Sequence, residues 1–166
     1  MAMRELRYFG DPVLKTACDP VTRFDNAVER LVADLLDSVK PAGRAGLAAP
    51  QIGVGLRVFS YDVAGVTGYV INPELVELSE VTHEIGEGCL SVPELRFPVT
   101  RAKRAVVRGV DLRNEPVVVE GEGVLAQCLQ HETDHLDGIL YLDRLAKGGK
   151  RESLRQARQK GWFWRR

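Results

Sequence analysis

The chain has 166 residues, of which 45% are hydrophobic, and its 23 basic and 23 acidic residues give a net charge of zero. This composition argues against a disordered protein and predicts one globular domain, residues 1–166, with a core that needs no disulfides. No apolar run approaches the roughly 20 residues of a membrane span, and residues 1–12 contain no signal-peptide hydrophobic region. We therefore expect a cytoplasmic protein that does not enter a membrane.

The N-terminal region predicts an irregular segment followed by a helix. Leu6–Val21 contains two Asp-Pro turn signals and no sustained periodicity, so we expect an extended lead-in. Apolar residues then recur with helical period over Asn26–Lys40, with Asn26 and Glu29 at the spacing of a capping box. Pro41 ends this helix.

A run of small residues follows the helix and ends in Gln51. The sequence Ala-Gly-Leu-Ala-Ala-Pro-Gln offers little side chain to a core, but it allows other groups to approach the backbone closely. The Gln51 amide can donate and accept hydrogen bonds. By itself the run is more typical of a simple turn between a helix and a strand than of a functional loop.

Most of the remaining chain before residue 121 predicts strands separated by Gly, Pro and Asn-Glu turn signals. Because no helix intervenes, the strands are expected to pair antiparallel, which predicts an α+β fold with the helices segregated from the sheets. The predicted strands are Leu56–Tyr61, Tyr69–Leu78, Val81–Ile85, Ala105–Leu112 and Val117–Glu120.

A second helical pattern begins at Val124 and ends at Gly138, a residue suited to a left-handed C-terminal position. Two neighbouring stripes of this helix are expected to be buried, and one polar arc is expected to face water. The stripes are Val124, Cys128, His131, His135 and Leu125, Leu129, Leu136, and the arc is Gln127, Gln130, Asp134, Asp137.

The spacing of two histidines in this helix is typical of a metalloenzyme. His131 and His135 are one turn apart, so both rings can reach a single metal ion, and Glu132 reaches the same space without being a ligand. The alternative is a pair of hydrogen-bonded core histidines beside a surface Glu. Two of the three His residues of the chain have this spacing, which favours metal binding.

A catalytic metal site needs a third protein ligand and one open position. Cys128 shares the histidine stripe, but it precedes His135 by nearly two turns, about 10 Å, so it cannot join both histidines on one ion. Cys89 lies in a Gly- and Pro-flanked segment and is the leading third ligand, with His83 as the alternative. Cys128 is then expected to line the pocket, and Cys18 to be an inert buried thiol.

Three separated motifs together resemble the peptide deformylases, enzymes that remove the formyl group from the N-terminal methionine of new bacterial polypeptides. The resemblance covers most of the chain and implies antiparallel sheets packed around a central metal-binding helix. The motifs are Gly-Leu-Ala-Ala-Pro-Gln at 46–51, Glu-Gly-Cys-Leu-Ser at 87–91 and Gln-His-Glu-Thr-Asp-His at 130–135.

The resemblance also implies roles for individual residues. Cys89, His131 and His135 would be the metal ligands, with water in the fourth position, and Glu132 would be the general base. Gln51 and the Leu90 N–H would stabilise the oxyanion. Further implied positions are a supporting ion pair, Glu87 with Arg101, and substrate contacts at Gly46, Arg96, Leu125 and Cys128.

The implied metal is Fe(II), with Zn(II) or another divalent ion able to replace it, because imidazole and thiolate suit both metals. The implied substrates are N-formylmethionyl nascent peptides, and a monomer is expected. One residue departs from the family pattern: Arg44 stands where the first motif usually begins with Gly, two residues before Gly46. This change concerns the edge of the substrate cleft more than the chemistry.

The C-terminal tail, residues 147–166, is basic. Nine of the 23 basic residues but only one acid, Glu152, lie after residue 143. Lys150–Lys160 predicts a short basic helix, followed by Trp-Phe-Trp at 162–164. The tail is either a solvated, partly frayed terminus or a segment that docks on ribosomal RNA through phosphate contacts and base stacking.

Two other functions are compatible with part of the pattern. A zinc peptidase would share the helix motif but would leave the Cys89 segment and Gln51 unexplained. A non-catalytic RNA- or ribosome-binding protein with a structural metal would need four protein ligands, and Glu132 and Gln51 argue against it.

Overall fold

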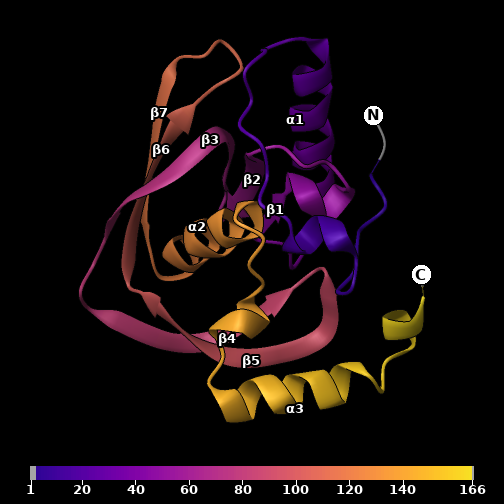
Figure 1. Ribbon diagram of the computed structural model, residues 1–166. Coiled ribbons are helices and arrows are strands. Elements are labelled where there is room, and N and C mark those ends of the chain that lie inside the picture. The colour runs from indigo at the N-terminus through magenta and orange to yellow at the C-terminus, as the bar shows by residue number, and fades with distance from the viewer. Residues whose placement is uncertain (1–2, 166) are drawn as a thin grey trace.

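Two antiparallel sheets lie on either side of one helix in the computed structural model, which describes residues 3–165 (Figure 1). The larger sheet has five strands in the order β1-β2-β3-β6-β7, and the smaller is the β4–β5 hairpin. The elements are η1 Pro12–Lys15, α1 Asn26–Val39, β1 Gly46–Ala48, η2 Ala49–Ile52, β2 Val58–Val63, β3 Val66–Leu78, β4 Thr82–Cys89, β5 Val92–Ala102, β6 Arg104–Val110, β7 Pro116–Glu122, α2 Gly123–Leu136, η3 Tyr141–Arg144, α3 Lys147–Ala157 and η4 Gly161–Trp164.

Side chains on the central strands of the five-stranded sheet point alternately to its two faces, and both faces are buried there. In the antiparallel register of β2 with β3, Val58 faces Ile71 and the next pair is Phe59 with Val70. Successive side chains of a strand point to opposite faces. Val58 and Ile71 therefore pack in the cluster that contains α1, whereas Phe59 and Val70 pack in the cluster that contains α2.

Helix α2 contacts the five-stranded sheet on one side and β5 on the other. Figure 1 shows this central position. The α+β fold with antiparallel sheets around a central helix is therefore confirmed. Gly138 has a φ of 74° and ends the helix as predicted.

Two details of the predicted helix faces are wrong. Val124, assigned to the buried stripe, is 52% exposed, and Gln130 and Asp134, assigned to the water-facing arc, are 6% and 5% exposed. The Gln130 amide accepts from Ala102 N and donates to Ala102 O, so this side chain joins α2 to β5. The second sheet buries the arc that polarity alone assigned to solvent.

The predicted capping box of α1 is also wrong. Asp25 is the N-cap residue, and its carboxylate accepts hydrogen bonds from the backbone N–H groups of Ala27 and Val28. Asn26 is the first helical residue. The helix otherwise covers the predicted range up to Val39.

Strands β1 and β5 were not predicted. β5 contains Pro93 and Pro98, and Pro is excluded from strands that pair on both sides. β5 pairs only with β4, so its other edge tolerates residues without an N–H donor. Strand β1 has only three residues.

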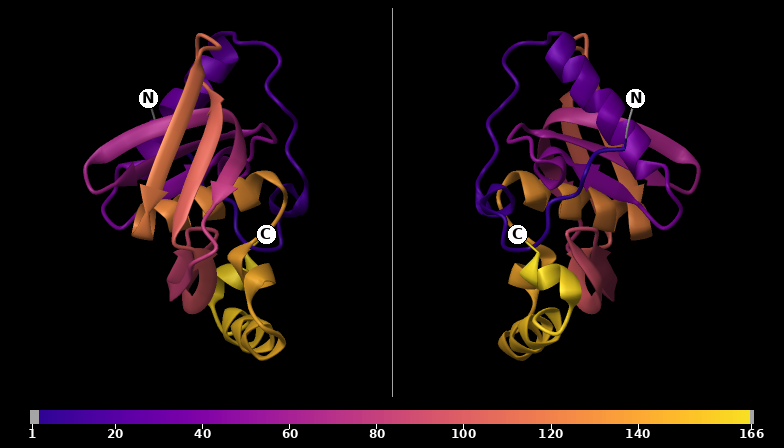
Figure 2. Two further views of the ribbon diagram at one scale, coloured as in Figure 1. Left: turned by 90° about the vertical axis from the view of Figure 1, so that its left-hand side faces the viewer. Right: turned by 90° about the vertical axis from the view of Figure 1, so that its right-hand side faces the viewer.

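The C-terminal tail packs on the body, so the frayed alternative is wrong for its described residues. Figure 2 shows α3 beyond the β4–β5 hairpin, at the end of the molecule away from the five-stranded sheet. Ser153 and Ala157 are fully buried, and Trp162 is 8% exposed and donates from Nε1 to the carbonyl of Pro93. Arg166 lies outside the described residues. Every helix between residues 3 and 165 is too short or too polar to span a bilayer.

Replacing Trp162 by Ala should lower the free energy of unfolding by about 3 kcal/mol, because a buried indole and its hydrogen bond are lost. Urea denaturation followed by circular dichroism measures the change. Trp164, 70% exposed, is the matched control, and Trp164→Ala should change stability by less than about 1 kcal/mol. Equal effects of the two substitutions would show that the tail is not docked as described.

Candidate metal centre and catalytic site

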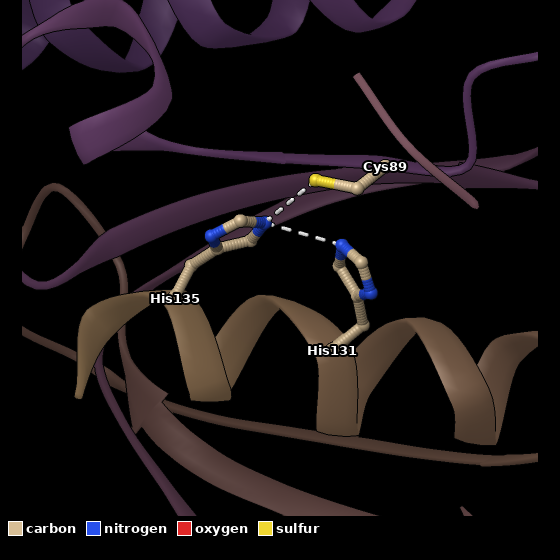
Figure 3. A group of neighbouring side chains, drawn as sticks. All are labelled: Cys89, His131 and His135. Carbon is tan, nitrogen blue, oxygen red and sulfur yellow. Dashed lines mark hydrogen bonds between the residues drawn. The ribbon is translucent and has the colours of Figure 1, made fainter. Parts of the chain in front are cut away.

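Three side chains from two elements point toward one another (Figure 3). His131 and His135 lie one turn apart on α2, and their Nε2 atoms are 3.1 Å from each other. Cys89 ends β4, and its Sγ lies 3.4 Å from His135 Nε2. All three donor atoms lie within 4.8 Å of one another.

The donor set has the chemistry and spacing of a metal site. His131 Nδ1 lies 2.5 Å from the Glu87 carboxylate, so the proton is on Nδ1 and the Nε2 lone pair faces the cluster. Two imidazole nitrogens on one tetrahedral ion lie about 3.3 Å apart, and a nitrogen and a thiolate about 3.6 Å. The observed 3.1 and 3.4 Å are close to these values, so the residues fit a divalent ion.

The other sequence candidates for ligands lie outside this cluster. His83 is on β4, six positions before Cys89, and is not part of the group. Cys128 donates from Sγ to the carbonyl of Ala45, and burial raises the pKa of its thiol well above the usual value. Burial likewise raises the pKa of Cys18 to about 11. Both thiols therefore stay protonated near neutral pH.

Glu132 follows His131 on α2 and is buried directly against Gly46. A Cβ at Gly46 would lie 2.5 Å from Glu132 Oε1 and 2.7 Å from Cys128 Sγ, so only Gly fits here. Burial raises the pKa of Glu132 to about 7. A carboxyl group with a pKa near neutrality can both take and return a proton at physiological pH.

The Gln51 amide is fixed with its NH2 group toward the donor cluster. Ala48 N donates to Gln51 Oε1 at 2.9 Å, which assigns the oxygen and directs Nε2 the other way. Nε2 lies 3.6 Å from Cys89 Sγ and 3.2 Å from Ser91 Oγ. Leu90, next to Cys89, is in the two-residue connection between β4 and β5.

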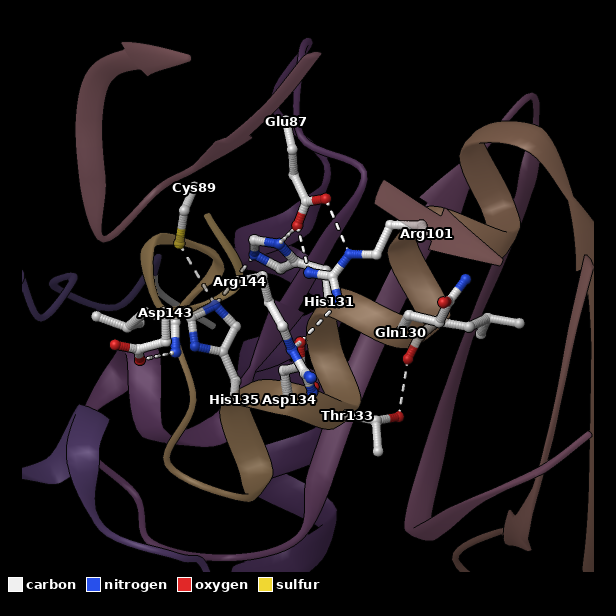
Figure 4. Close-up of polar contacts among 12 residues, drawn as sticks. Glu87, Cys89, Arg101, Gln130, His131, Thr133, Asp134, His135, Asp143 and Arg144 are labelled. Carbon is white, nitrogen blue, oxygen red and sulfur yellow. Dashed lines mark hydrogen bonds and ion pairs between the residues drawn. The ribbon is translucent and has the colours of Figure 1, made fainter. Parts of the chain in front are cut away.

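A buried network of charges supports His131 (Figure 4). Arg101 donates to Glu87 through Nε and Nη2, and through Nη1 to Asp134. Arg144 then binds Asp134 with two nitrogens. Burial alone would raise the pKa of Glu87, but hydrogen bonds from His131 and Arg101 lower it to about 2, so the carboxylate is ionised when it holds His131.

Four supporting residues were not found by sequence reasoning: Gln130, Asp134, Arg144 and Ser91. Asp134 lies within the third motif, but because it is polar it was predicted to face water. Arg144 lies between the second predicted helix, which ends at Gly138, and the predicted basic helix that begins at Lys150, and Ser91 lies two residues after Cys89. Each acts through partners distant in the chain, and no periodic pattern carries that information.

A cleft of about 620 Å³ opens beside Cys89. Arg44, Leu90 and Arg96 line it, and Ala45, the neighbour of Gly46, also lines it. Leu125 is half-buried and packs against the core cluster of α2. Of the four expected substrate contacts, Arg96 lines the cleft, whereas Gly46, Leu125 and Cys128 do not, and Cys128 and Leu125 pack in the core cluster of α2.

Comparison with known proteins identifies the family. The polypeptide deformylase family model matches residues 3–151. The chain belongs to this family. A peptide deformylase from Acidothermus cellulolyticus is 52% identical over 162 residues, which are 98% of this chain and 89% of that protein.

Solved structures of the family share the fold. The peptide deformylase from Legionella pneumophila has a TM-score of 0.88 at 38% identity and covers 95% of both chains. That from Ehrlichia chaffeensis, in complex with actinonin, has a TM-score of 0.90 at 29% identity and covers 97% of this chain and 99% of its own. The family is metal-dependent, and the Cys89, His131 and His135 cluster agrees with this property.

Proposed function

We propose that this protein hydrolyses the N-terminal formyl group of formylmethionyl nascent polypeptides and releases formate, with Cys89, His131 and His135 as the metal ligands. The observation that carries the proposal is the convergence of these three donor atoms, with the buried Glu132 next to His131 on α2. The family assignment favours deformylation over an internal peptidase or a non-catalytic binding protein. A divalent ion in this position acts as a Lewis acid that lowers the pKa of water and polarises carbonyl oxygens.

Glu132 is the general base in this proposal. Its carboxylate takes a proton from the water that attacks the formyl carbon, and it later gives the proton to the leaving amine. The C–N bond then breaks to give formate and a free methionyl N-terminus. A pKa of about 7 supports both transfers, because the group is close to half-ionised at neutral pH.

Gln51 and the backbone N–H of Leu90 are the proposed oxyanion donors. The Gln51 NH2 group is held in place by the bond from Ala48 N to its oxygen, so it needs no reorganisation when negative charge develops on the formyl oxygen. The small volume around Gly46 limits the acyl group that fits against Glu132. Arg96, Leu125 and Cys128 complete the proposed contacts to the methionine and the following chain.

The proposal also specifies the metal ion, the oligomeric state and the cellular location. Fe(II) is the proposed ion, with Zn(II) or another divalent ion as a substitute, because a Cys-His-His set suits both. All proposed catalytic groups come from one chain, which is consistent with a monomeric single catalytic domain over residues 1–166. The cytoplasm is the proposed location, because formylated polypeptides emerge there.

Glu132→Ala should abolish formate release from formyl-Met-Ala-Ser while the protein, purified without air, keeps about one metal ion per chain. Cys89→Ala is the matched control, and it should lose both the metal and the activity. Formate is assayed enzymatically, and iron and zinc are determined on the same samples. Retained turnover in Glu132→Ala, or metal without turnover in the parent loaded with either ion, would contradict the proposal.

Gln51→Ala should reduce kcat by about a hundredfold or more, since removal of one oxyanion donor costs roughly 3 to 4 kcal/mol of transition-state stabilisation. Formate release at saturating peptide measures the change. Gln159→Ala, exposed after the end of α3, is the control and should leave kcat near that of the parent. A rate for Gln51→Ala within severalfold of the parent would remove Gln51 from the oxyanion site.

Ribosome contact through the tail is also part of the proposal. Arg151 and Arg158 are exposed on and after α3, where they can reach phosphates. The double variant Arg151→Gln and Arg158→Gln should bind ribosomes more weakly in co-sedimentation at low salt, with an unchanged melting temperature. Arg113→Gln, in the β6–β7 turn, is the control. Equal ribosome binding by all three proteins would refute the contact.

A further inference from the structure

Two arginine side chains line the cleft beside Cys89, and both are held by backbone carbonyls. Arg44 Nη1 donates to the carbonyl of Ser38 at 2.5 Å, and Arg96 Nη2 donates to that of Gly86 at 2.9 Å. Within residues 3–165, no carboxylate lies within 4.0 Å of either guanidinium. Glu94 adds one negative charge to the same lining, so the cleft carries a net positive charge.

Arg44 is the residue that departs from the Gly of the family motif. Ser38 is in the last turn of α1, where carbonyl groups lack a partner within the helix, so its carbonyl fixes one guanidinium nitrogen. A guanidinium has five N–H donors in a planar fork. The remaining donors and the charge therefore stay available to a ligand in the cleft.

Arg44 lies on the lining of the cleft, close to the proposed reaction centre. Gly46 lies against the Glu132 carboxylate and so marks the reaction centre. Arg44 is two residues away, at most about 7 Å along the chain. An extended peptide advances about 3.3 Å per residue, so a substrate that leaves the centre through this cleft brings the residues after formylmethionine within reach of Arg44.

We propose that Arg44 determines specificity and favours formylated peptides that carry Asp or Glu at the first or second position after formylmethionine. The inference rests on the proposed function. An Arg–carboxylate pair at a solvent-accessible rim increases kcat/KM for such peptides by about threefold to fivefold over neutral ones at low salt. The Arg44 guanidinium bonds the Ser38 carbonyl and is not part of the donor cluster, so it acts on peptide choice rather than on the chemistry.

The test uses four C-terminally amidated peptides, in which no terminal carboxylate competes for the arginine. They are formyl-Met-Ala-Ser, formyl-Met-Asp-Ser, formyl-Met-Ala-Asp and formyl-Met-Lys-Ser. With metal-loaded parent enzyme, at least one Asp peptide should exceed the Ala-Ser peptide in kcat/KM by about threefold to fivefold at low salt. The preference should shrink as salt screens the pair, and the Lys peptide should be the poorest.

Arg44→Gln separates a specificity role from a structural one. Gln keeps a polar amide but carries no charge, so the preference for Asp should fall to a ratio of about one. Arg44→Lys should retain part of the preference. Arg113→Gln, which removes a charge from the distant β6–β7 turn, should keep the parental ratio. Loss of the Ser38 contact alone would lower stability and affect all four peptides equally.

A parental ratio of one or less, or a preference that survives in Arg44→Gln, overturns the inference. Arg44→Gly, which restores the residue typical of the family motif, replaces Arg44→Gln if that variant does not fold. Formate release from the Ala-Ser peptide separates the proposed function from the role of Arg44. Its absence refutes the proposed function, whereas its presence without a preference for Asp refutes only the role of Arg44.

Discussion

The structure depends on burying a charged helix face between two sheets. His131, Glu132 and Asp134 are all less than 10% exposed, and transferring such groups from water is costly unless each finds a partner. Arg101 offsets much of this cost because it binds both Glu87 and Asp134. Removing one partner from such a buried pair leaves an uncompensated buried charge, so each charged residue of the network is needed for the stability of the others.

Glu87 and Glu132 are both buried in this site, but their pKa values shift in opposite directions. Glu87 accepts hydrogen bonds from Arg101 and His131, which lower its pKa to about 2. Glu132, with one carboxylate oxygen unpartnered among the described residues, has a pKa that burial raises to about 7. One carboxylate therefore stays ionised and orients a ligand, while the other can exchange protons. Residue identity alone does not distinguish them, since environment sets both values.

The local chemistry of the sequence predicted α1, α2 and most strands, and the three motifs placed the metal cluster. The errors arise where partners are distant in the chain. Gln130 and Asp134 were assigned to water because periodicity records polarity, yet their partners Ala102 and Arg101 lie 28 and 33 positions away. β5 was missed because its prolines are unfavourable in a strand, and only the topology shows that one edge is free.

The position of Cys89 depends on support from both sides of a small hairpin. A two-stranded sheet is marginally stable by itself in water, so β4 and β5 need other elements to hold the thiol near the histidines. On the inner side, the Gln130 amide joins α2 to β5. On the outer side, Val92, Leu95 and Val99 pack in one cluster with Tyr141 and Trp162. The C-terminal segment is thus part of the scaffold of the metal centre, although it supplies none of the three donor atoms.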